Sequence, residues 1–113
     1  MSDAQTLIDR WLPQVRKGLL EMLILELLDQ RTSYGYEIAQ RLRGVLGADI
    51  AEGTLYPLLK RLSRDRMVTT EWITEAGGAP RKYYAITAEG QDVLRRMRAE
   101  LARIDRARKE LLK

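Results

Sequence analysis

The segment from Glu52 to Arg66 constrains the fold more than any other stretch of this chain. Its leucines recur at the spacing of a single helical face: Leu55, Leu58, Leu59 and Leu62. Small, hydroxyl and basic side chains lie off that face: Thr54, Tyr56, Pro57, Lys60, Arg61 and Arg64. The sequence therefore predicts a helix with an apolar back and a basic front, which suits a groove lined with phosphates. Pro57 fits this helix if Thr54 is the N-cap, because amides of the first turn have no helical partner.

The composition excludes several kinds of site. The 113 residues include no cysteine and no histidine, so a transition-metal site, a disulfide scaffold and a His-based catalytic triad cannot be built. The carboxylates Glu52, Asp65, Glu71 and Glu75 show no spacing typical of an acid/base pair. We therefore expect a non-enzymatic protein without a metal or a cofactor.

The charge distribution favours nucleic acid as the partner. The net charge is +4, yet residues 1–30 carry three basic and five acidic groups. The basic surplus therefore lies in the middle and at the end of the chain, as expected for a protein with a face for DNA. The apolar run 19–28 is too short to span a bilayer, and no signal peptide precedes it. We expect a cytoplasmic protein that does not bind membranes.

The first predicted helix covers residues 4–30, with a bend near Pro13 or Gly18. From Leu19 to Leu28 it is apolar on nearly every side, which indicates that more than one side is covered. One side can face its own domain, and a partner subunit is the simplest cover for the other.

A second helix is predicted between residues 33 and 46. Thr32 or Ser33 is the expected N-cap, and Gly47 is placed to end the helix in a left-handed conformation. Four residues then lead to the basic helix. Two short amphipathic helices joined in this way predict a helix-turn-helix.

After Arg66 the period changes to that of a β-hairpin. Residues 67–75 and 81–87 are the predicted strands, and the glycine-rich residues 76–80 form the turn. Arg81 and Lys82 are expected at the base of this hairpin, where they either reach DNA or pair with Glu71 or Glu75. Tyr83 and Tyr84 are expected to pack within the hairpin.

Thr87 is the expected cap of a last helix over residues 88–112. This helix carries a heptad seam made of Leu94, Met97, Leu101, Ile104, Arg108 and Leu111. The seam is too short for a coiled coil that stands alone. It predicts pairing with another apolar surface, such as the first helix of a second subunit.

The chain resembles the PadR family of bacterial transcriptional regulators. Four segments carry the resemblance: Gly18–Leu28, Ser33–Ile38, Glu52–Leu62 with its Gly-Thr-Leu-Tyr-Pro start, and Arg81–Gly90 with its Arg-Lys-Tyr-Tyr start. The resemblance implies a homodimer, joined through its first and last helices, that binds a pseudo-palindromic double-stranded DNA operator and usually represses. The single short C-terminal helix is similar to the smaller size class of the family.

The resemblance does not extend to one ligand-binding mode of the family. Some small members bind flat aromatic compounds between tryptophans of their last helices. Here the last helix has no aromatic residue, and Leu101 stands at the aligned position. Trp11 in the first helix is the alternative aromatic wall, with dimer packing as its plainer role. A small hydrophobic or aromatic effector therefore stays an open expectation.

Together these features predict a mainly α (α+β) fold, a winged helix-turn-helix with a two-stranded wing. Residues 1–87 would form the DNA-binding part, and residues 88–113 the dimerisation helix. For DNA contact we expect Ser33, Tyr36, Thr54, Tyr56, Pro57, Lys60, Arg61, Arg64, Arg81 and Lys82, with a core role equally open for Tyr36. For the dimer or effector pocket we expect Trp11, Leu94, Met97, Leu101 and Ile104. The alternative function is a winged-helix module that binds protein instead of DNA.

Overall fold

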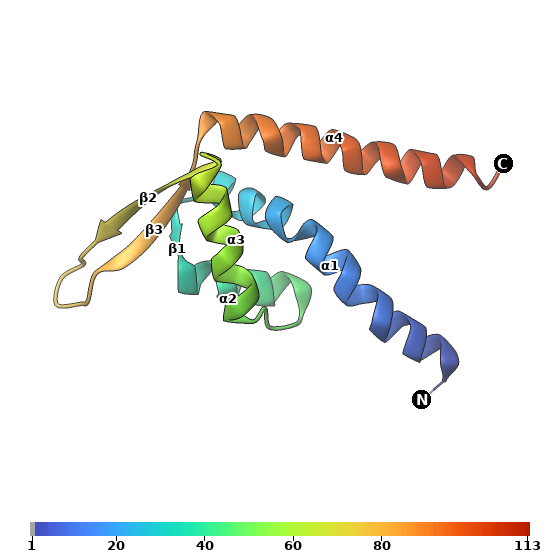
Figure 1. Ribbon diagram of the computed structural model, residues 1–113, viewed down its shortest axis with the longest axis horizontal. Helices are drawn as coiled ribbons and strands as arrows, with labels where there is room; N and C mark the ends of the chain where they lie inside the picture. Colours follow the sequence, from blue (N-terminus) through green and yellow to red (C-terminus); the bar gives the residue numbers. More distant parts are fainter. Residues whose placement is uncertain (1) are drawn as a thin grey trace.

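The computed structural model describes residues 2–113 as four helices and a three-stranded antiparallel sheet (Figure 1). The fold is mixed α and β, as the sequence predicts. α2 and α3 lie next to the sheet, while α1 and α4 extend away from it and diverge toward their free ends (Figure 1). The described chain measures 57 × 36 × 21 Å along its principal axes. None of its helices has the length and apolar character needed to cross a membrane.

Helix α1 runs from Asp3 to Gln30, so the predicted first helix is confirmed. The side chain of Ser2 caps it by accepting a hydrogen bond from the amide of Gln5, at 3.1 Å. Pro13 lies inside the helix and does not end it. The two halves differ in burial, because the buried residues all lie in the second half: Leu20, Ile24, Leu25, Leu27 and Leu28. The first half extends beyond the core of the chain.

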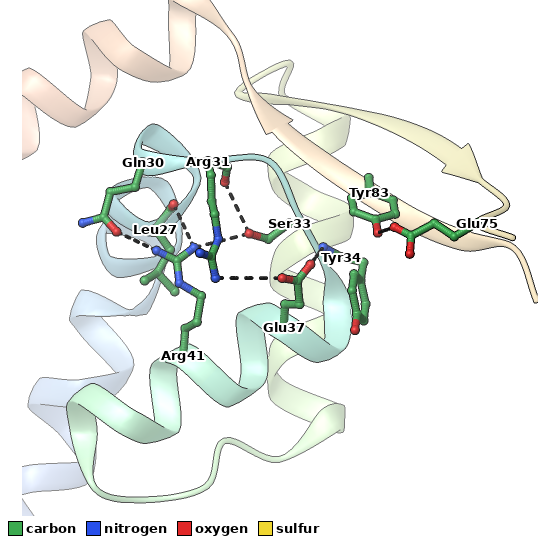
Figure 2. A network of polar contacts seen from close by, with 9 residues as sticks. All are labelled: Leu27, Gln30, Arg31, Ser33, Tyr34, Glu37, Arg41, Glu75 and Tyr83. Carbon is green, nitrogen blue, oxygen red and sulfur yellow. Dashed lines mark hydrogen bonds and ion pairs between the residues drawn. The ribbon is translucent and has the colours of Figure 1, made fainter. Parts of the chain in front are cut away.

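The junction between α1 and α2 is held by Arg41 of α2 (Gly35–Leu46) (Figure 2). Its guanidinium donates to the carbonyl oxygen of Leu27 at 3.2 Å, to Oγ of Ser33 at 3.3 Å and to Oε1 of Gln30 at 2.6 Å. One guanidinium thus supplies hydrogen-bond donors both to the last turn of α1 and to the segment that follows it. This partly buried arrangement, with the buried hydroxyl of Ser33 at its centre, fixes how α2 leaves α1.

The prediction that Thr32 or Ser33 caps α2 is wrong. Tyr34 is the N-cap, and its backbone amide donates to Oε1 of Glu37 at 3.2 Å. Ser33 and Tyr34 instead form a short strand, β1 (Ser33–Tyr34), which no local sequence pattern predicts. The other end of α2 is as expected, because Gly47 follows it with φ +69° in the left-handed region.

Helix α3 runs from Glu52 to Arg64 and carries the expected leucine stripe. Leu55, Leu59 and Leu62 are buried and Leu58 is half-buried. The expected cap at Thr54 is wrong, because the helix begins earlier, with Ala51 as N-cap. Pro57 therefore lies in the second turn, where it leaves the carbonyl of Gly53 without its helical donor.

The sheet has the strand order β1-β3-β2, with β2 at Val68–Ile73 and β3 at Arg81–Ile86. All neighbours are antiparallel, and the β2–β3 hairpin is the predicted wing. The placement of its cations at the base is wrong. Arg81 is opposite Ile73 in the last pair before the turn, whereas Val68 and Ile86 form the pair at the base. The cations therefore lie near the wing tip.

Helix α4 runs from Ala88 to Glu110, and Thr87 caps it as predicted, accepting from the amide of Gly90 at 3.0 Å. Its start packs closely on the turn after α3. A Cβ on Gly90 would lie 2.2 Å from the carbonyl oxygen of Met67, so only glycine fits there. Leu94 is 1% exposed and belongs to the core cluster that joins α1, α2, α3 and the sheet. Beyond Leu101 every residue of α4 is exposed.

Candidate nucleic-acid interface

A groove of about 910 Å³ opens between α3, the start of α2 and the wing. Four cations line it: Lys60, Arg64, Arg81 and Lys82. The remaining lining residues are aromatic, small or hydroxyl side chains: Tyr34, Gly35, Tyr36, Tyr56, Ser63, Trp72 and Tyr84. No carboxylate lines the groove, and none of its four cations has an ion-pair partner within residues 2–113. Such a groove attracts anions.

The helical period of α3 explains how its share of the groove is built. Tyr56, Lys60 and Arg64 are four residues apart and form one stripe along α3. The buried leucines hold the opposite side of the helix against the core, so this stripe has to face outward. Lys60 and Arg64 are both exposed.

The wing contributes its cations through aromatic contacts. Cζ of Arg81 lies 4.5 Å from the ring centroid of Tyr34, and Nζ of Lys82 lies 5.8 Å from that of Tyr84. Tyr34 in turn meets Tyr83 edge to face, with ring centroids 5.3 Å apart. These contacts attach the cations to the sheet without neutralising them.

Neither Glu71 nor Glu75 forms an ion pair with the wing cations within the described chain. Glu75 accepts instead a hydrogen bond of 2.6 Å from the hydroxyl of Tyr83 (Figure 2). This bond raises the pKa of Tyr83 above its ordinary 10.0, because the carboxylate disfavours a phenolate beside it. Burial raises the pKa of Tyr84 in the same direction. Both tyrosines take part in packing, as expected.

Two tyrosines border the groove where α2 meets α3. Tyr36, in the first turn of α2, is exposed, and its hydroxyl accepts from Nε2 of Gln40 at 2.5 Å. A core role for Tyr36 is thereby excluded. Tyr56 lies against Gly35, where an added Cβ would be 2.9 Å from Cε1 of the tyrosine ring. Gly35 thus permits the close approach of α2 to α3.

Ser33 does not belong to this surface. Its side chain is 0% exposed, and Oγ donates to the carbonyl oxygen of Arg31 at 3.3 Å while it accepts from Arg41 (Figure 2). A hydroxyl enclosed in this way cannot reach a phosphate. The expectation of DNA contact by Ser33 is therefore corrected to a structural role.

The remaining residues of α3 that were expected to contact DNA face α1 and not the wing. Thr54, Pro57 and Arg61 line a smaller groove of about 290 Å³ toward α1, together with Lys17, Glu21, Gly53 and Leu58. Arg61 forms an ion pair and a hydrogen bond with Glu21 of α1. The structure therefore divides the front of α3 into a face toward the wing and a face toward α1.

Sequence reasoning missed Trp72. It is opposite Lys82 in the hairpin, lines the large groove and is 67% exposed. The strand period offered a signal, because residues 68, 70 and 72 of β2 share one face and Val68 points into the core. Following that face outward leads to Trp72.

The five residues expected at a dimer or effector site do not all lie together. Trp11 is exposed on the first half of α1, whereas Leu101 and Ile104 are exposed on α4. Met97 is half-buried and shares with Leu101 and Ile104 a cleft of about 290 Å³ between α4 and α1. Leu94 is in the core of the single chain, so its expected place at a contact between subunits is wrong.

A family model and several solved structures identify one family. The sequence model of the transcriptional regulator PadR-like family matches residues 24–96. The structure of a PadR family transcriptional regulator from Eggerthella lenta superposes with a TM-score of 0.83 at 34% identity, covering 100% of this chain and 95% of that one. A PadR-like transcription factor from Bacteroides fragilis gives 0.77 at 35% identity, over 90% and 98%. An uncharacterised protein of Lysinibacillus sphaericus is 33% identical over 78% of this chain and 83% of its own.

Proposed function

The chain belongs to the PadR-like family of transcriptional regulators, and from this premise we propose that it is a homodimeric repressor of a pseudo-palindromic operator. Members of the family are DNA-binding regulators and not enzymes. In the proposal, the winged helix-turn-helix up to residue 87 contacts DNA, and the helix over residues 88–113 joins the subunits. Its place of action is the cytoplasm.

One observation carries the proposal: the groove between α3 and the wing is lined by four cations that have no acidic partner in the described part of the chain. In the proposed complex α3 enters the major groove. Lys60 and Arg64 then lie toward one phosphate strand, and Arg81 and Lys82 approach the same strand from the wing. Tyr36 and Tyr56 donate hydroxyl hydrogen bonds to phosphates at the edge of this contact.

Base reading is assigned to the early turns of α3. Thr54 and Pro57 are exposed there and can contact a thymine methyl group. Lys60 and Arg61 mainly contact phosphates, and either one can also donate to a guanine edge beside its phosphate. The phosphate contacts supply most of the affinity and a steep dependence on salt.

The dimer is proposed from the halves of α1 and α4 that lack cover in the subunit. Leu7, Ile8 and Trp11 are exposed on α1, and Leu101 and Ile104 on α4. The two helices diverge toward their free ends (Figure 1). We propose that the corresponding helices of a second subunit cover these exposed side chains. Pairing there would set two copies of α3 about one DNA turn, roughly 34 Å, or a multiple apart.

Release is assigned to a small hydrophobic or aromatic effector at the dimer centre. It acts by changing the angle between the subunits, so that the two copies of α3 no longer match the half-sites. The effector must bind the two arrangements with different affinity, since otherwise it shifts nothing. Trp11 and Trp72 are the two tryptophans of the chain. A compound that quenches the fluorescence of the wild type but not of Trp11→Phe would therefore bind near Trp11.

The decisive experiment is a footprint of the purified protein on its own promoter, followed by titration at several salt concentrations. Lys60→Ala should weaken binding and reduce the salt slope by about 0.9 per lost phosphate contact. Arg96→Ala on α4, where Arg96 pairs with Asp92, is the matched control and should leave binding unchanged. If no promoter fragment is protected over competitor DNA, or if Lys60→Ala binds like the wild type, the repressor proposal fails.

A further inference from the structure

Arg61 differs from the other cations of α3. Lys60 and Arg64 have no acidic partner within residues 2–113, whereas Arg61 is paired with Glu21 of α1. The pair joins the recognition helix to the helix assigned to dimerisation. Both partners stay accessible, with 48% of the Arg61 side chain and 35% of the Glu21 side chain exposed.

The surroundings of the pair suit a phosphate. The groove that contains it is also lined by Lys17 and by Gly53 and Thr54 of the first turn of α3. Among residues 2–113, Glu21 is the only acidic residue that lines it. A carboxylate at the guanidinium of Arg61 occupies the donors that a DNA phosphate on this side of α3 would use, because both anions accept the same planar fork of N–H groups.

Resting on the proposed function, we infer that Glu21 is an internal competitor of the DNA phosphate for Arg61. In the free protein Glu21 holds Arg61 on the α1 side of α3. On DNA, Arg61 exchanges the carboxylate for a phosphate of the strand opposite the wing. Glu21 thereby lowers the affinity for DNA and decreases its dependence on salt.

The exchange is feasible because exposed ion pairs are weak. An exposed ion pair stabilises a protein only slightly, so a DNA phosphate can displace the carboxylate of Glu21 from Arg61. The wild-type chain gains little from the exchange, since one pair replaces another. When Arg61 leaves, Glu21 takes up a cation from solution, which cancels the counterion that Arg61 releases from the phosphate.

The inference is tested by a double-mutant cycle on the full-length protein, with a duplex of its own promoter region as the probe. The variants are Glu21→Gln, Arg61→Ala and the two combined. Glu26→Gln is the matched control, because Glu26 lies five residues further along α1 and pairs with Arg98 of α4. The exposed fractions of these two side chains, 34% for Glu26 and 47% for Arg98, nearly equal those of the Glu21–Arg61 pair. Thermal unfolding of each variant verifies that it folds.

Glu21→Gln should bind DNA about two- to fivefold more tightly per subunit, the range expected for release of an exposed pair. Its salt slope should be steeper by about 0.9 per subunit. The gain should vanish in the Arg61→Ala background, and Glu26→Gln should bind like the wild type. The inference is overturned if Glu21→Gln binds DNA no more tightly than the wild type. It is also overturned if Glu21→Gln increases the affinity equally in the wild-type and Arg61→Ala backgrounds.

These outcomes are separable from failure of the proposed function. If Lys60→Ala weakens promoter binding while Glu21→Gln has no effect, the protein binds DNA as proposed and only the competition is wrong. If the wild type does not prefer its promoter over competitor DNA, the proposed function fails, and the competition fails with it.

Discussion

The guanidinium of Arg81 lies over the ring of Tyr34, with Cζ 4.5 Å from the ring centroid. Tyr34 belongs to β1 and also caps α2. One aromatic ring thus links a cation near the wing tip to the beginning of the helix-turn-helix. The wing is thereby oriented by a residue outside its own hairpin.

Replacing Tyr34 by leucine should weaken promoter binding about two- to fivefold per subunit. The reason is loss of a cation–π contact, typically about 0.5–1 kcal/mol at exposed sites, which leaves Arg81 without a fixed position. Tyr34→Phe keeps the ring and should retain wild-type affinity. Fluorescence anisotropy with a labelled duplex measures both. Equal affinities of the leucine and phenylalanine variants would show that the ring does not position Arg81.

Replacing Gly90 by alanine should destabilise the fold by about 1–3 kcal/mol, as overpacking does. The new Cβ would lie 2.2 Å from the carbonyl oxygen of Met67, which already accepts from the backbone amide of Thr87 at 3.0 Å. Gly44→Ala is the control. It meets nothing within 4 Å inside α2 and should stabilise by about 1 kcal/mol through helix propensity. Urea unfolding measures both changes, and a neutral Gly90→Ala would contradict the close packing of α4.

Replacing Ile104 by glutamate should weaken subunit association by about tenfold or more, because the dimer would bury an unpaired carboxylate. Ile104 is exposed in the subunit and lies on the heptad seam. Ala99→Glu changes an exposed residue on the outer side of the same helix and should leave association unchanged. Sedimentation velocity over a range of concentrations gives the dissociation constants. A dimer that tolerates glutamate at 104 would place the subunit contact elsewhere.

The stability of the protein should fall as the pH rises through about 10 and beyond. Burial raises the pKa of Tyr84 above its ordinary 10.0, so the folded state keeps the phenol proton after the unfolded state has released it. The stabilisation from the neutral phenol is complete below pH 10 and is lost as the pH increases toward the raised value. Tyr84→Phe removes this contribution and should show a shallower decline in the free energy of unfolding. If the free energy of unfolding falls equally with pH in the wild type and in Tyr84→Phe, the raised pKa of Tyr84 does not contribute to stability.

Local periodicity was enough to predict the main elements. The leucine spacing predicts α3, the glycine after α2 predicts its left-handed end, and the threonine before α4 predicts its cap. Each of these signals depends on residues within a few positions of one another, which a single sequence displays directly.

The errors at β1, Ser33 and Arg61 concern partners that are distant along the chain, whereas the misplaced cap of α3 and the misplaced wing cations are local errors. Strand β1 exists because Ser33 and Tyr34 pair with Tyr84 and Tyr83, about fifty residues away. The same pairing buries Ser33, and Glu21 engages Arg61 across forty positions. No local pattern encodes such contacts, so sequence reasoning placed the hydroxyl and the guanidinium on one surface with the other cations.

The bare halves of α1 and α4 have a consequence for how the protein would respond to its own abundance. If cover for them comes only from a second copy, then below the dimer dissociation constant the concentration of dimer rises with the square of the subunit concentration. Promoter occupancy would then change more steeply than protein level. A cell could switch the regulated gene by modest changes in synthesis or degradation of this chain, before any ligand is bound.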